Sequence, residues 1–211
     1  MYLPKHFTHD DTGLAHAAIR AYPFASVVTI GANAEPFVTH APLALDLRGP
    51  AAEQAVLVGH FAAANPHSQL LTTAPQILAI FSGPNAYVSP AHYASKETVP
   101  TWNYVAVHAY GIVRIIHDEA AKDASQKRLI ADHEPGYAAQ WRALDPTYQS
   151  KMLGGITVFE IEVTRLEAKF KLSQNRPADD RARVYAHHAA GSPQERGLAQ
   201  WMTHLGLASP E

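Results

Sequence analysis

Three consecutive residues carry the most evident chemistry in this chain, namely Thr101, Trp102 and Asn103. They follow the rigid Pro100 and open an alternating run of apolar and polar residues, which predicts a strand with one buried face. A hydroxyl and an amide here flank an indole, so small hydrogen-bonding groups lie beside a large flat apolar surface. That combination suits a planar aromatic ligand with a polar edge. The alternative is a structural turn whose indole fills the core.

A second group of polar residues precedes a predicted helix near the C-terminus. Lys171, Ser173 and Arg176 lie just upstream of Pro177, and Asn175 is available as a helix cap. Free N–H groups at a helix start attract anions, so the segment is an acceptable anion site. The alternative is an ordinary strand-to-helix junction with solvated basic residues. Lys96, in a stretch with two proline turns, is a further charge that could contact a phosphate.

Several kinds of chemistry lack the residues they need. The chain has no cysteine, which removes disulfides, thiolate metal sites and cysteine nucleophiles. It has 13 histidines but no His-Glu-x-x-His and no close metal-ligand cluster on one predicted face. His187 and His188 are adjacent and are expected on different sides of a helix. We therefore predict no metal site. A Gly-x-Ser-x-Gly elbow, a Walker loop and a Gly-x-Gly-x-x-Gly fingerprint are also missing.

Composition and charge describe a folded protein with no obvious affinity for nucleic acid or membrane. Of 211 residues, 47% are apolar and 17% charged, and the formal net charge is −2. The densest basic stretch, residues 169–183, is interrupted by Asp179 and Asp180, so direct DNA binding gains little support from the charge pattern. No apolar run approaches the ~18 residues of a membrane span, and residues 1–6 have no signal-peptide pattern. We expect a cytoplasmic protein without membrane contact.

The pattern of predicted elements favours a mainly β (α+β) fold. Predicted strands cover residues 24–30, 37–45, 55–61, 76–81, 87–89, 104–116 and 155–166, and the first predicted helix, capped by Asp10 or Asp11, ends before Pro23. Pro42 should place its strand at an edge or bulge, or open its backbone to a ligand. Short strand spacing and peripheral helices predict a closed or split antiparallel barrel. We expect a single domain over residues 1–211, in which 177–211 form a helical C-terminal extension broken at 191–193.

Six motifs in order resemble one known family. They are MYLPKHF (residues 1–7), THAPL (39–43), GHFAAANPH (59–67), FSGPNAYVSP (81–90), VPTWNY (99–104) and KLSQNR (171–176). Together they resemble the PaiB family, described as FMN-binding negative transcriptional regulators. The resemblance implies an FMN-binding split β-barrel of the pyridoxamine-phosphate-oxidase type, and a homodimer that binds FMN at the subunit interface.

The resemblance also implies which residues contact the cofactor. The expected FMN-binding residues are Thr39, His40, His60, Asn65, Lys96, Thr101, Trp102, Asn103, Lys171, Ser173 and Gln174. One position departs from the family, which often has Arg where this chain has Ala63. If that Arg holds the flavin phosphate, then Lys96, Lys171 or Arg176 must supply the charge here.

The sequence leaves two classes of function open. One is an FMN-binding negative transcriptional regulator, which acts on DNA directly or through a partner. The alternative is an FMN-dependent oxidoreductase of the pyridoxamine-phosphate-oxidase-like class, whose substrate the residues do not identify. A haem-handling split barrel would draw on the many histidines, but no axial-ligand motif stands out.

Overall fold

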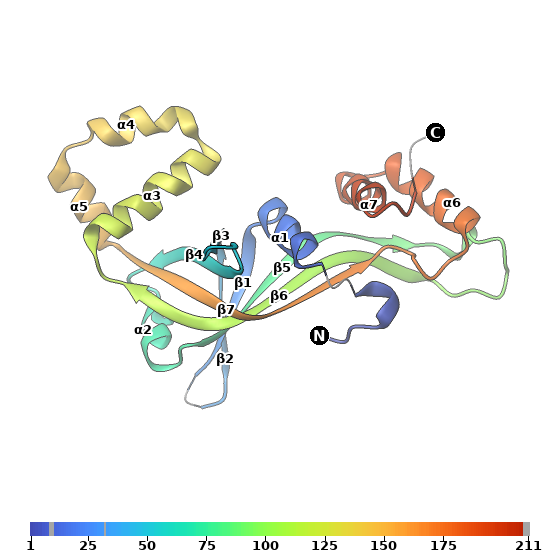
Figure 1. Cartoon of the computed structure of the whole chain (residues 1–211), viewed down its shortest axis with the longest axis horizontal. Helices are drawn as coiled ribbons and strands as arrows, with labels where there is room; N and C mark the ends of the chain where they lie inside the picture. The colour runs from blue at the N-terminus through green and yellow to red at the C-terminus, as the bar shows by residue number, and fades with distance from the viewer. Residues whose placement is uncertain (9–10, 32, 209–211) are drawn as a thin grey trace. The chain divides into compact units, whose positions relative to one another are not determined.

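The computed structural model describes residues 1–8, 11–31 and 33–208. Within these residues, seven strands form one sheet in the order β2-β1-β5-β6-β7-β4-β3 (Figure 1). Their bounds are β1 Phe24–Ile30, β2 Pro36–Pro42, β3 Ala44–Arg48, β4 Gln54–Ala62, β5 Gln76–Val88, β6 Thr101–Ile116 and β7 Ile156–Lys171. The pairs β1–β2, β3–β4 and β4–β7 are antiparallel. The predicted α+β class with a dominant antiparallel sheet is confirmed.

The helices begin where the sequence supplies capping side chains. Asp11, Asn65 and Asp118 each accept a backbone N–H of the helix that follows them. Asp10, the other cap considered, lies outside the described residues. The helical segments are η1 Lys5–Phe7, α1 Thr12–Ala21, α2 Pro66–Thr73, η2 Pro90–His92, α3 Glu119–His133, η3 Pro135–Tyr137, α4 Ala138–Ala143, α5 Pro146–Gly154, α6 Ala178–Ala189 and α7 Pro193–His204. None of the helices in the described part of the chain is long and apolar enough to cross a membrane.

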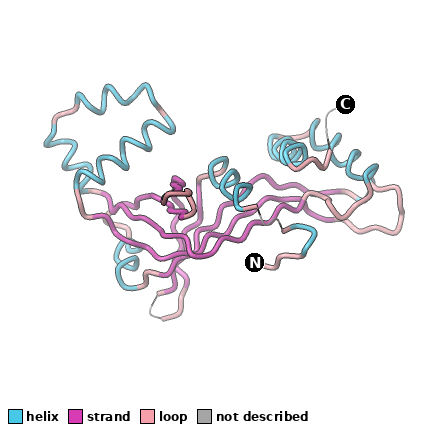
Figure 2. Tube along the Cα trace, in the orientation of Figure 1, coloured by secondary structure: helices cyan, strands magenta, loops and turns pink. Residues whose placement is uncertain are grey.

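The chain contacts divide into two compact units. Unit 1 contains residues 1–22, 81–108 and 167–211, and unit 2 contains residues 23–80 and 109–166. The long strands β5, β6 and β7 each contribute residues to both units, and Figure 2 traces them as continuous extended segments. The expectation of a single domain over 1–211 stays a prediction.

Unit 2 is built on two antiparallel groups of strands and a set of helices. β1 pairs with β2, and β4 lies between β3 and β7. Leu57, Phe159 and Ile161 are fully buried in this unit. Helices α3, α4 and α5 follow one another in the chain (Figure 1). They contribute a small apolar cluster of their own, in which Trp141 packs with Ile130 and Leu153. Apolar burial of this kind is the main source of stability in each unit.

Unit 1 contains the C-terminal helices, which pack against each other as a pair. A capping box at Ser192 and Glu195 starts α7 directly after α6 ends, so the predicted break at residues 191–193 is confirmed. The indole of Trp201 on α7 packs its ring 5.1 Å from that of Phe170 and donates to the hydroxyl of Tyr22 at 3.0 Å. These contacts tie α7 to other segments of the same unit.

Several predicted boundaries were wrong, among them the end of the last strand, which runs to Lys171 and not to residue 166. The strand expected over 37–45 is interrupted after Pro42, and β2 is an edge strand, as Pro42 indicated. The strands expected over 76–81 and 87–89 are one continuous strand, since Gly83 packs closely against Val105 and Tyr22 instead of forming a turn. Asn175 is not the cap of α6, because Pro177 occupies that position without a side-chain bond.

Candidate functional site

The segments predicted to form an anion site meet at a small basic cavity in unit 1. Thr101 and Asn103 come from the start of β6, and Lys171 is the last residue of β7. The cavity has a volume of about 90 Å³ and is also lined by Tyr93, Val99, Ser173, Asn175 and Arg176. Two motifs that are separate in the sequence, VPTWNY and KLSQNR, therefore line the same cavity in the structure.

Lys171 holds the two motifs together. Its ammonium donates to the carbonyl of Trp102 at 2.7 Å and to the hydroxyl of Thr101. Partial burial, together with Lys169 and Arg176 nearby, lowers the pKa of Lys171. Repulsion among these cations makes an anion at this position electrostatically favourable.

Tyr93 and Arg176 give the cavity its open hydrogen-bonding capacity. The guanidinium of Arg176 lies over the Tyr93 ring, 4.1 Å from its centroid. The Tyr93 hydroxyl is buried and has no hydrogen-bond partner among the described residues. A buried hydroxyl without a partner is costly, so a ligand oxygen here would be stabilised. This cavity fits a phosphate group, whereas flavin-sized ligands occupy pockets of roughly 300–1,000 Å³.

Two further predicted residues shape the turn beside the cavity. Ser173 has φ +66°, a left-handed conformation that is unusual for a residue other than glycine. Its hydroxyl contacts the buried amide of Asn103, with Asn103 Nδ2 3.1 Å from Ser173 Oγ. Gln174 accepts the N–H of Leu172 at 2.7 Å and donates to the carbonyl of Phe170. Ser173 and Gln174 thus fix the backbone that carries Lys171 to the cavity.

Trp102 does not fill the core. Its side chain is 48% exposed, and its indole N–H donates to the Asn85 side chain at 3.3 Å. Its ring meets Tyr87 edge-on, with centroids 6.2 Å apart. The alternative of a buried indole plug is wrong, and Trp102 presents an aromatic surface on the strand that also lines the cavity.

Thr39 and Asn65 come together in unit 2 around a residue that the sequence reasoning missed, His67. The ring nitrogens of His67 lie 2.8 Å from Thr39 Oγ1 and 2.9 Å from Thr29 Oγ1, and Asn65 donates to Thr39 at 3.1 Å. Burial lowers the pKa of His67, so the ring is neutral at pH 7. The signal was the motif GHFAAANPH, of which only His60 and Asn65 were selected.

The remaining predicted residues are dispersed. His40 lies on the outer face of β2, where it contacts Ser26 at 3.0 Å and stacks on Phe24. His60 on β4 is half-buried, and burial lowers its pKa. Lys96 is exposed in the loop between η2 and β6 and does not line the small basic cavity.

Ala63, the departure from the family pattern, lines a different cavity. This cavity belongs to unit 2, has a volume of about 290 Å³, and is also lined by Ser68, His117 and Lys122. Lys122 is therefore a second lysine at a cavity wall, and it provides a direct comparison with Lys171.

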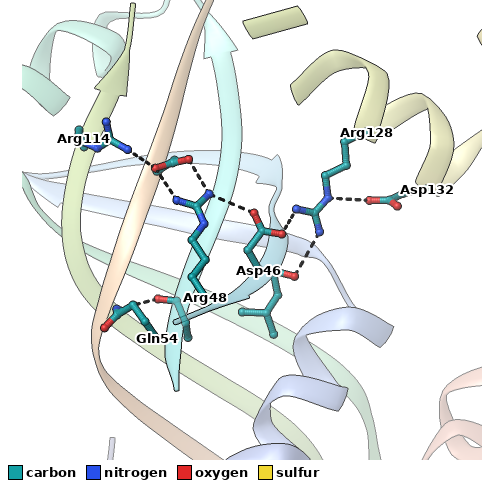
Figure 3. Close-up of polar contacts among 9 residues, drawn as sticks. Asp46, Arg48, Gln54, Arg114, Arg128 and Asp132 are labelled. Atoms are coloured by element: carbon teal, nitrogen blue, oxygen red, sulfur yellow. Dashed lines mark hydrogen bonds and ion pairs between the residues drawn. The ribbon is translucent and has the colours of Figure 1, made fainter. Parts of the chain in front are cut away.

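One cluster of charged residues on unit 2 is internally paired (Figure 3). Arg48 donates two hydrogen bonds to Glu160, and Arg114 donates a third at 2.6 Å. These arginines, Arg48 first, lower the pKa of Glu160. Asp46 pairs with both Arg48 and Arg128. A cavity of about 510 Å³ borders Glu160, but its cations already have carboxylate partners, so it is a poor anion site.

Comparisons with known proteins define first the class and then the family. The fold is similar to that of the flavocytochrome Anf3 from Azotobacter vinelandii, with a TM-score of 0.61, 21% identity, and coverage of 80% of this chain and 72% of that one. It is equally similar to the FAD and heme binding protein from Mycobacterium smegmatis, with a TM-score of 0.61, 16% identity, and coverage of 82% and 78%. The fold is therefore that of the split-barrel flavin- and haem-binding proteins.

The family described as "Putative FMN-binding domain" matches residues 1–165. The chain is also 34% identical over 181 residues to the "Protease synthase and sporulation protein PAI 2" of Bacillus subtilis (strain 168), and the match covers 85% of each protein. This chain belongs to that FMN-binding family. The resemblance to the PaiB family and the expectation of FMN as cofactor are confirmed.

Proposed function

We propose that the protein holds the phosphate of FMN in the small basic cavity of unit 1. The observation that carries this proposal is that Lys171 and Arg176 line one small cavity together with Tyr93, a residue whose hydroxyl is buried without a partner among the described residues. Thr101, Ser173 and Asn175 add neutral polar groups on the same walls. Charge-assisted hydrogen bonds to phosphate are the strongest that such groups make.

The isoalloxazine ring lies outside this cavity, because about 90 Å³ is too small for it. Trp102 lies in sequence between the cavity-wall residues Thr101 and Asn103, and its exposed indole is available to stack on or flank the ring. Thr39, His40, His60, Asn65 and Lys96 remain proposed contacts, on the strength of the family resemblance. Bound FMN would supply redox chemistry at its ring, while these residues would bind and orient it.

We further propose that the protein is a homodimer. Phe24, Ile30 and Val38 are 64%, 53% and 47% exposed on the paired strands β1 and β2 of unit 2. Val28 and Val38 face each other across this pair, and such a patch of large apolar side chains is expensive to leave in water. A second copy of the chain can cover it by an isologous contact.

We propose that in the cell the protein is a negative transcriptional regulator. It acts through a partner, and bound FMN affects this action. A partner is preferred to direct DNA contact because the net charge is −2 and the arginine cluster on unit 2 is already paired with carboxylates. The alternative, an FMN-dependent oxidoreductase, requires a donor that reduces the bound flavin.

The first experiment is an absorbance spectrum of the purified protein, followed by a fluorescence titration of the flavin-free form with FMN. Flavin bands and saturable binding support the proposal, and a Soret band without flavin bands would instead favour haem. The second experiment compares promoter DNA binding with flavin reduction by NADH or NADPH. If the bound flavin is reduced rapidly, an acceptor is turned over and transcription is unaffected, the protein is an oxidoreductase and the proposed regulatory function is wrong.

A further inference from the structure

A second group of potential ligand atoms lies at the corner between α6 and α7. His188, in the last turn of α6, is fully buried. Its Nδ1 has no hydrogen-bond partner among the described residues. Such an atom loses its hydration on folding without recovering a bond, which is costly unless something else occupies that position.

Two more residues with potential ligand atoms lie beside His188. His187 precedes His188 on the helix, and Glu195 lies in the first turn of α7. Nε2 of His187 lies 3.2 Å from Oε1 of Glu195. One ligand atom from each of these three residues lies within 4.8 Å of the other two. Two imidazoles and one carboxylate are the ligands of many zinc sites.

We propose that His187, His188 and Glu195 bind a divalent ion of the zinc type. A small inward movement of the three side chains brings their ligand atoms to the distance of about 2 Å that zinc requires. The three protein ligands leave a fourth position for water. Because the ligands come from both helices, the ion fixes the corner between α6 and α7.

The carboxylate of Glu195 supplies negative charge to the cluster, and carboxylate oxygens are ordinary zinc ligands. Glu195 is ionised, and its other oxygen, Oε2, accepts the N–H of Ser192 at 2.7 Å in the capping box.

The groups around the cluster are compatible with the ion. His92 packs its ring 4.4 Å from that of His187 and restricts its orientation. Arg183, one helical turn before His187 on α6, is engaged by the carboxylate of Asp180 and by the carbonyl of His92. It therefore does not oppose the ion with an uncompensated charge.

Asn103 can adapt to the bound form. Its Nδ2 lies 3.5 Å from Nε2 of His188, whereas a ring that binds metal through Nδ1 carries its proton on Nε2. A 180° rotation of the amide would place Oδ1 opposite that proton. Ser173 Oγ contacts both ends of the amide, at 3.1 and 3.3 Å, and a hydroxyl can donate or accept, so the rotation loses no bond.

The test is a calorimetric titration of the chelator-treated full chain with zinc chloride. We expect one equivalent per chain, a raised melting temperature, and, with cobalt in place of zinc, the intense visible bands of a tetrahedral ion. His187→Ala removes an exposed ligand. Glu195→Gln removes a ligand charge but keeps the capping box, because Gln also serves at that position. Each should weaken binding by at least about tenfold, the loss that even outer-sphere partners of a metal can cause.

His133→Ala is the matched control, since His133 is an exposed histidine in the last turn of a helix, α3. It should leave the zinc affinity and the cobalt spectrum unchanged. The proposal fails if the wild-type chain binds less than one equivalent of zinc at micromolar concentrations. It also fails if His187→Ala and Glu195→Gln bind as the wild type does, because zinc is then held by other histidines.

Discussion

The ammonium of Lys171 donates to the backbone carbonyl of Trp102, 2.7 Å away. A second N–H goes to the hydroxyl of Thr101. An ammonium has three donors, so one remains for a ligand. The same side chain thus fixes the start of β6 and faces the proposed phosphate, which links the position of the indole to the anion-binding group.

Lys171→Ala should weaken FMN binding roughly ten- to a hundredfold, because a charge-assisted hydrogen bond contributes about 1.5–3 kcal/mol. A fluorescence titration of the flavin-free protein measures the dissociation constant. Lys122→Ala is the control at the cavity beside Ala63. If Lys122→Ala reduces the affinity and Lys171→Ala does not, the phosphate belongs to that other cavity.

Trp102→Phe should shift the absorbance of bound flavin or relieve quenching of its fluorescence. The indole is 48% exposed, so the melting temperature of the flavin-free protein should move little, as for other surface substitutions of about 0.5 kcal/mol or less. Spectra and thermal melts of both proteins test this. An unchanged flavin spectrum would remove Trp102 from the site.

Val38→Glu should dissociate the proposed homodimer, because it places a charge in the apolar face of β1 and β2. Light scattering should show a dimer for the wild type and a 23.0 kDa species for the variant. Tyr148→Glu, which alters an exposed aromatic residue on α5, should remain dimeric. A wild-type protein that is monomeric at micromolar concentration contradicts the proposal.

His67 should make stability depend on pH. Burial holds its pKa below the ordinary 6.5 in the folded protein, so the unfolded chain binds the proton first as the pH falls. The stability that the neutral ring contributes to the folded protein is complete above pH 6.5 and is lost as the pH drops toward the lowered pKa. The free energy of unfolding, measured with denaturant between pH 8 and 5, should change less steeply with pH for His67→Gln than for the wild type. His133→Gln, at an exposed position, should keep the wild-type slope; equal slopes in all three proteins would exclude His67 as a source.

Local sequence signals predicted the elements whose causes are local. Asp11 marked the start of α1, and residues 191–193 marked the start of α7, because capping depends on neighbouring residues. The extended conformation at Gly83 could not be predicted in this way. Its cause is contact with Tyr22 and Val105, which are remote in sequence.

The same distinction applies to the candidate site. Lys171 and Thr101 were predicted from their motifs, and the structure brings them into hydrogen-bond contact. Tyr93 could not be predicted as a cavity residue, since nothing in its neighbours shows that its hydroxyl is buried without a partner. Glu195 was missed as a partner of His187 because the two residues lie on different helices, and the sequence search considered ligands on one predicted face.

The prolines at the two ends of β2 bear on how the protein avoids aggregation. Pro36 and Pro42 begin and end this edge strand. They occupy alternate positions of the strand together with Val38 and His40, so the four residues lie on the same face. Two of these four positions lack an N–H, so another chain cannot extend the sheet there with a full ladder of hydrogen bonds. In the single chain, where the apolar face of β2 is exposed, this strand would otherwise be a template for fibril growth. Replacing both prolines should therefore leave the fold intact but shorten the lifetime of concentrated solutions.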